Sequence, residues 1–170
     1  MPETAKPVFL VDPYSDPVVV RIEGRANFQN SACLRDFVAE MIHQRKSRFV
    51  LDFLNCSSMD STFLGVLAGA AIQLRKENPQ GSLTLMRVGP RNLELIRNLG
   101  LHRILTVDSG AFPMNFGQHP DTPLVCPDRS ELENARLALE AHESLCAADD
   151  ANRAKFQDVL VFLRNRIDQR

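Results

Sequence analysis

Two kinds of hydrophobic pattern alternate along most of the chain. Short, nearly continuous apolar runs are typical of buried strands, and they occur at residues 7–12, 17–24, 48–55, 82–88 and 103–107. Apolar residues spaced three and four apart predict helices, here over about residues 31–46, 61–77 and 91–99. Strands that alternate with helices of this length are typical of crossover units. The pattern therefore predicts an α/β fold with a mixed sheet and helices packed on it.

The pattern changes beyond residue 107. Residues 111–127 are rich in proline and glycine and have no period, which predicts a loop or linker. Two amphipathic helical patterns follow within residues 128–170 and predict a C-terminal helical hairpin. Residues 1–110 would then form the α/β domain and 128–170 its extension. The apolar stripes of the hairpin must be covered by the domain, by each other, or by a second subunit in a homodimer through these helices.

Composition and charge indicate an ordinary soluble protein. Hydrophobic residues make up 44% of the 170, charged residues 24%, and the formal net charge is −1. A balance this close to neutral predicts neither nucleic acid nor an anionic membrane as a partner. The N-terminus lacks the basic start and apolar run of a signal peptide, and no apolar stretch approaches the ~18 residues of a membrane span. We therefore expect a cytoplasmic protein without membrane insertion.

The cysteines show no pairing signal. Cys33, Cys56, Cys126 and Cys146 are far apart and contain no CxxC pair. A zinc site or a redox motif is therefore not predicted, and in a reducing cytosol all four are expected to be free thiols.

Signals for metal, cofactor or catalysis are also missing from the sequence. The histidines lie in different predicted elements, at positions 43, 102, 119 and 142, without ligand-like spacing. The chain has no phosphate-binding loop, dinucleotide fingerprint or nucleophile elbow. We expect no metal, no cofactor and no enzymatic activity.

A cluster of capping residues begins the helix predicted over 61–77. The carboxylate of Asp60 can accept from the N–H groups of the first turn. Ser61 and Thr62 follow it directly. Taken alone, this cluster is most simply explained as a helix cap.

The wider context of this cluster resembles the STAS family, which includes the anti-sigma factor antagonists. The resemblance rests on ordered motifs and covers roughly residues 17–107, as follows: Ile22-Glu23-Gly24, Met59-Asp60-Ser61-Thr62, Leu64-Gly65-Val66-Leu67 and Leu99-Gly100-Leu101-His102-Arg103-Ile104. It implies a STAS-like mixed sheet of four to five strands. The chain departs from the family at Phe63, where glycine is common.

The resemblance also implies a function and a site. Ser61 would be the phosphorylation site, Thr62 a second candidate, and Asp60 would support the acceptor or contact the kinase. The modifying partners would be a serine/threonine kinase that doubles as an anti-sigma factor and a PP2C-type phosphatase. The ATP would belong to the kinase.

A helical wheel of residues 61–77 divides this helix into two faces. Leu64, Leu67, Ala71 and Leu74 mark the core side, at about 100° per residue. The opposite side carries Thr62, Gly65, Gly69 and Ile72 beside Ser61. Because two glycines make this side smooth, we interpret it as a partner-binding surface. The alternative is that another element of the same chain packs closely there.

These observations predict an anti-sigma factor antagonist-like regulatory protein, a protein-binding switch controlled by phosphorylation in bacterial signalling or transcription control. Two alternatives stay open. The first is an unphosphorylated STAS scaffold subunit of a signalling or lipid-transport complex. The second is a small ligand-binding domain or enzyme that uses the strand ends near Ser57, Asp60 and Ser61.

Overall fold

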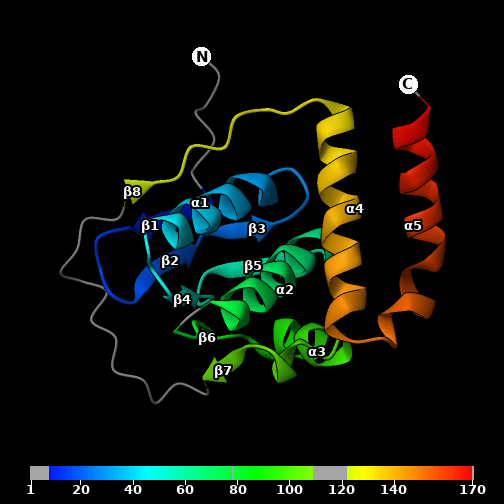
Figure 1. The fold of residues 1–170 in the computed structure, drawn as a ribbon. Helices are drawn as coiled ribbons and strands as arrows, with labels where there is room; N and C mark the ends of the chain where they lie inside the picture. Colours follow the sequence, from blue (N-terminus) through cyan, green and yellow to red (C-terminus); the bar gives the residue numbers. More distant parts are fainter. Residues whose placement is uncertain (1–7, 78, 109–121, 170) are drawn as a thin grey trace.

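The computed structural model describes residues 8–77, 79–108 and 122–169. Figure 1 shows the elements in chain order. They are β1 (Phe9–Asp12), β2 (Val18–Ile22), β3 (Gly24–Ala26), α1 (Ser31–His43), β4 (Arg48–Asp52), β5 (Cys56–Met59), α2 (Ser61–Lys76), β6 (Ser82–Met86), α3 (Pro90–Asn98), the 3-10 turn η1 (Leu101–Arg103), β7 (Thr106–Asp108), β8 (Thr122–Pro123), α4 (Glu131–Ala148) and α5 (Asn152–Asp168).

The main sheet is mixed, as predicted, and has the strand order β7-β6-β4-β2-β1-β8. Strands β2, β4, β6 and β7 are parallel neighbours. Strand β1 is antiparallel to both β2 and β8. The central strand β4 buries four of its five residues, as expected of a strand that pairs with parallel neighbours on both edges.

The strand number exceeds the predicted four to five. Strands β3 and β5 form a separate two-stranded ladder. Strand β8 lies inside the predicted linker, where Pro123 pairs with Leu10 at the sheet edge. Proline is tolerated there because an edge strand can spare one N–H donor. The rest of the predicted linker up to residue 121 lies outside the described residues.

Strands β2, β4, β6 and β7 are shorter than their apolar runs. The run at 48–55 leaves the sheet after Asp52, whose carboxylate binds the guanidinium of Arg87. Gly100 ends α3 with a φ of 73°, as the sequence predicted. The chain then forms the turn η1, so the last parallel strand begins only at Thr106.

Phe63 fills the centre of the core. Its side chain is fully buried, stacks on Phe9 at a ring-centroid distance of 6.2 Å and meets the edge of Phe53 at 6.4 Å. The departure from the family's common glycine is therefore absorbed inside the domain. It adds an aromatic anchor beneath the first turn of α2 rather than a bulge on its surface.

The C-terminal hairpin forms as predicted and packs on the domain. Figure 1 shows α4 beside α2, and α5 on the far side of α4. Ser130 and Glu133 form a capping box that begins α4. The hydrogen bonds to Ser130 hold the pKa of the Glu133 carboxyl below its ordinary value. Leu145 of α4 is completely buried in the main core.

The prediction of four free thiols is wrong for one pair. Cys33 in α1 and Cys126 form a disulfide, with their Cα atoms 5.2 Å apart. Strand β8 returns the chain along β1 and delivers Cys126 to the first turn of α1. The pair is 93 residues apart in sequence, so local spacing contains no sign of it. Cys56 and Cys146 are free and buried.

Candidate functional site

Asp60 joins three segments at the start of α2. Its Oδ1 accepts a hydrogen bond from the N–H of Phe63 at 2.9 Å, which confirms the predicted helix cap. Its Oδ2 accepts from the N–H of Phe28 at 2.8 Å. Its own N–H donates to the carbonyl of Ala26. The carboxylate is thus used on both oxygens, and it fixes the backbone that presents Ser61.

Ser61 lies at the first position of α2 and contacts α4. Its Oγ is 2.9 Å from Nε2 of His142. The other ring nitrogen, Nδ1, is 2.6 Å from the carbonyl oxygen of Ala138. Because a carbonyl oxygen only accepts, Nδ1 carries a hydrogen, and in the neutral ring Nε2 accepts from the Ser61 hydroxyl. One side of the predicted phosphoacceptor is therefore held by a histidine of the hairpin.

His142 is itself firmly held. The residue is only 4% exposed. Its ring meets the edge of the Phe156 ring at 5.0 Å, so α5 supports it from behind. A buried imidazole with both nitrogens engaged has one orientation, and this orientation aims Nε2 at Ser61.

The other side of Ser61 opens into a surface cavity of about 510 Å³. Its walls are largely apolar and come from β5, α2, α3 and α5. The lining residues are Met59, Ser61, Leu64, Leu95, Asn98, Leu99, Lys155 and Phe156. Lys155 is the one cation among them, and its ammonium donates to the carbonyl oxygen of Asn98. A group attached to Ser61 has room in this cavity.

Helix α4 covers the predicted partner-binding surface. A Cβ on Gly65 would lie 2.2 Å from the carbonyl oxygen of Ala141, and one on Gly69 would lie 3.1 Å from Oγ of Ser144. Thr62 is only 5% exposed, and Ile72 is half-buried. The glycines therefore let another element of the same chain pack closely. This close packing favours the alternative reading of the glycines, although Gly65 and Gly69 also line a surface cavity of about 320 Å³ between α1, α2 and α4.

The hairpin is anchored to the end of α3 by Asn152. This side chain is fully buried, and its Nδ2 donates to the carbonyl oxygens of Leu99 at 3.0 Å and Leu145 at 2.8 Å. Gly100 makes room beside it, since a Cβ there would lie 2.2 Å from a carboxylate oxygen of Asp149. The Gly100-Leu101 motif thus serves the docking of the hairpin as well as the end of α3.

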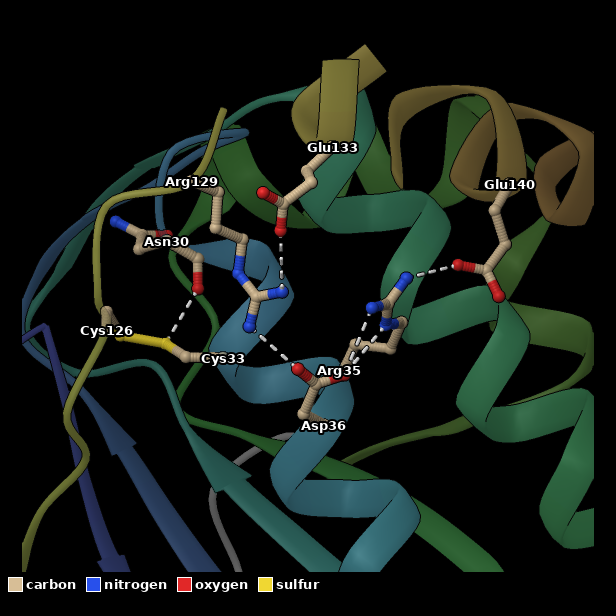
Figure 2. Close-up of polar contacts among 8 residues, drawn as sticks. All are labelled: Asn30, Cys33, Arg35, Asp36, Cys126, Arg129, Glu133 and Glu140. Carbon is tan, nitrogen blue, oxygen red and sulfur yellow. Dashed lines mark hydrogen bonds and ion pairs between the residues drawn. A yellow bond between two sulfur atoms is a disulfide. The ribbon is translucent and has the colours of Figure 1, made fainter. Parts of the chain in front are cut away.

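A second group of contacts fastens α4 to α1, and we call it the α1 clasp (Figure 2). It consists of the Cys33–Cys126 disulfide, an ion pair between Arg35 and Glu140 at 2.6 Å, and one between Arg129 and Asp36 at 2.8 Å. Exposed ion pairs contribute little each. Of these contacts, the disulfide fixes the position of the segment that leads into α4.

Cys56 lies just before the site but is not a reactive thiol. Burial raises its pKa to about 11, against a weaker opposing contribution from the backbone of Ser58. Within residues 8–77, 79–108 and 122–169, no group of three or more His, Cys, Asp or Glu side chains could hold a metal ion. None of the helices described is long and apolar enough to cross a membrane.

The sequence placed Asp60 and Ser61 correctly at the start of α2 but did not identify His142, Lys155 or Asn152. These residues come from the hairpin, and His142 is 81 residues from Ser61. Among the histidines that the sequence left unassigned, His119 lies outside the described residues. No local spacing distinguishes His142 from the others.

A family model described as "Mlab, STAS domain" matches residues 10–106. The match covers more than half of the 170 residues, and the chain belongs to the STAS domain family. The matched segment ends before the hairpin, so His142 and Lys155 lie outside the part that the family model describes.

Several solved structures are similar to this chain. An anti-sigma factor antagonist from Mycobacterium paratuberculosis is 19% identical, with a TM-score of 0.54, over 62% of this chain and 88% of that one. The Bacillus cell fate determinant SpoIIAA in its phosphorylated form is 20% identical, with a TM-score of 0.49, over 59% and 91%. The unphosphorylated antagonist SpoIIAA is 21% identical, with a TM-score of 0.47, over 52% and 81%. At 19% identity, the likeness to the Mycobacterium paratuberculosis structure supports the fold alone.

Proposed function

We propose that this chain is a protein-binding switch of the anti-sigma factor antagonist type, controlled by phosphorylation of Ser61. The observation that carries the proposal is the placement of the Ser61 hydroxyl. It stands at the N-terminus of a capped helix, is half-exposed, and borders a cavity with room for a phosphoryl group. Thr62 is buried and therefore a poorer acceptor.

Phosphorylation at this position is compatible with the fold. A phosphoserine adds nearly two negative charges, and the positive end of the α2 dipole favours an anion there. The Asp60 carboxylate is already used by two N–H donors, so it stabilises the loop that presents the serine. The modification would change the surface at the start of α2 without breaking the core.

The partners are proposed by resemblance to the anti-sigma factor antagonists. We propose a cytoplasmic serine/threonine kinase of the anti-sigma type as the enzyme that modifies Ser61, and a PP2C-type phosphatase as the enzyme that restores it. The ATP is bound by the kinase, and we assign no reaction to the chain itself.

The proposal can be tested with the kinases of this type that are encoded in the same genome. The chain is incubated with each kinase and ATP, and the product is digested and examined by mass spectrometry. We expect one phosphate on Ser61 and none in Ser61→Ala. The matched control is Ser58→Ala, an exposed serine of β5, which should leave the modification intact. An unmodified Ser61, together with a Ser61→Asp variant that keeps every interaction, would favour the scaffold alternative.

A further inference from the structure

We propose that the α4–α5 hairpin forms a binding site, within the chain itself, for a phosphate monoester on Ser61, with His142 and Lys155 as its cationic ligands. The inference rests on the proposed function, since it concerns the phosphorylated form of the same serine. In this proposal the phosphate fastens the hairpin onto α2 instead of repelling it.

A phosphoryl group on Ser61 can extend from Oγ in only one direction. Nε2 of His142 closes one side of Oγ at 2.9 Å, and His142 is backed by the Phe156 ring. The open side is the cavity of about 510 Å³, more than ten times the ~30 Å³ that one water occupies in the liquid. A phosphoryl group on Ser61 therefore enters this cavity and keeps His142 at its edge.

The charges around the cavity suit a dianion. Lys155 belongs to its wall, and its ammonium binds a backbone carbonyl rather than, among the residues described, any carboxylate. A carbonyl oxygen carries no net charge and does not neutralise the ammonium. The positive charge of Lys155 is therefore available to the phosphate. His142 contacts both Ser61 and Phe156, which line the cavity, and it is buried, so a charge-assisted hydrogen bond from it would be strong.

In the kinase reaction the γ-phosphorus of ATP forms a bond to Oγ, its bond to the β-phosphate oxygen breaks, and ADP leaves. The proton of the Ser61 hydroxyl departs to solvent. One proton from solvent then lies between Nε2 and the nearest phosphate oxygen. Nδ1–H keeps its bond to Ala138, and Nε2–H now donates to a phosphate oxygen.

Phosphorylation of Ser61 would therefore stabilise the docked position of the hairpin. The phosphorylated chain holds α4 over Gly65 and Gly69, so the glycine face stays covered. The unmodified chain keeps only the Ser61–His142 hydrogen bond at this point, and it is the form from which the hairpin can be displaced.

Phosphoserine installed at position 61 of the full chain during translation tests this without any kinase. Hydrogen exchange of the α4 amides is measured with and without the phosphate, in the natural chain and in His142→Gln and Lys155→Met. We expect the phosphate to slow exchange at least about tenfold in the natural chain and markedly less in either variant. Lys155→Arg should keep the effect, and Lys76→Met, at the exposed end of α2, is the control.

A second readout uses a non-specific phosphatase. The phosphate on Ser61 should be removed at least about tenfold more slowly from the natural chain than from His142→Gln, whereas a phosphate on Ser58 should be removed equally fast from both. A merely structural role of His142 would change exchange by the same factor with and without the phosphate, and that result overturns the proposal. Faster exchange upon phosphorylation also overturns it.

The two proposals fail separately. If no kinase modifies Ser61, the switch function fails while the exchange data still report whether the pocket binds phosphate. If a kinase modifies Ser61 but His142 and Lys155 have no influence on the installed phosphate, the pocket is wrong and the switch stands.

Discussion

The carbonyl oxygen of Ala141 occupies the space in which a Cβ on Gly65 would lie, at 2.2 Å from that position. The neighbour is backbone, so it cannot rotate away as a side chain would. The close approach of α2 and α4 therefore depends on this one glycine. A substitution that adds only one methyl group at Gly65 therefore tests how the hairpin docks on α2.

Gly65→Ala should loosen the hairpin. Alanine raises helix propensity by up to about 1 kcal/mol, but the overlap with α4 costs about 1–3 kcal/mol, so we expect a net loss of stability. Urea unfolding measures the loss, and hydrogen exchange locates it in α4 and α5. Gly69→Ala is the matched control, because its Cβ would meet only the side chain of Ser144 at 3.1 Å. Equal effects of the two substitutions would contradict the packing described.

Reduction of the Cys33–Cys126 disulfide should lower the stability of the chain. The bond closes a loop across 93 residues, and disulfides typically contribute about 2–4 kcal/mol by restricting the unfolded chain. Urea midpoints are compared with and without a thiol reductant. In Cys33→Ser the reductant should have no effect, which separates the disulfide from other actions of the reagent.

The thiol of Cys56 should react slowly in the native protein. With a pKa raised to about 11, roughly one thiol in a thousand is ionised at pH 8, and the thiolate is the nucleophile. Iodoacetamide labelling followed by mass spectrometry should show Cys56 modified far more slowly in the folded chain than in urea, with a rate that rises as the pH approaches 11. Rapid labelling of the folded chain at pH 8 would rule out this environment.

The homodimer expected through the C-terminal helices would use exposed apolar side chains of α5. Helix α5 leaves Val159, Val161 and Phe162 exposed by 38%, 51% and 67%, and apolar side chains grouped on one helix are typical of an interface. Sedimentation equilibrium of the full chain should give a dimer mass that Phe162→Glu reduces to a monomer. Leu54→Glu, at an exposed apolar residue outside the hairpin, is the control. A monomer at all concentrations removes the dimer.

Local patterns predicted the elements that local forces determine. The Asp60 cap, the glycine end of α3 and both helices of the hairpin follow from interactions over three or four residues, and all are present. The buried side of α2 at Leu64, Leu67 and Leu74 also follows from its period.

The rest of the site depends on contacts between distant segments. His142 reaches Ser61, and Cys126 reaches Cys33, only because the hairpin and β8 return to the domain. Helical period alone cannot say whether a glycine stripe faces a partner or another helix of the same chain. At Gly65 that choice was decided by the packing of α4, which has no signature within α2 itself.

The disulfide also gives the molecule an unusual connectivity. Cys33 and Cys126 close a covalent ring that contains most of α1, the helices α2 and α3, and the strands β4 to β8. The hairpin leaves this ring only a few residues after Cys126. A break at any one peptide bond between the two cysteines therefore leaves a single molecule, in which α4 is still tied to α1. The two pieces of a nicked chain would stay covalently joined until the bond between the cysteines is reduced.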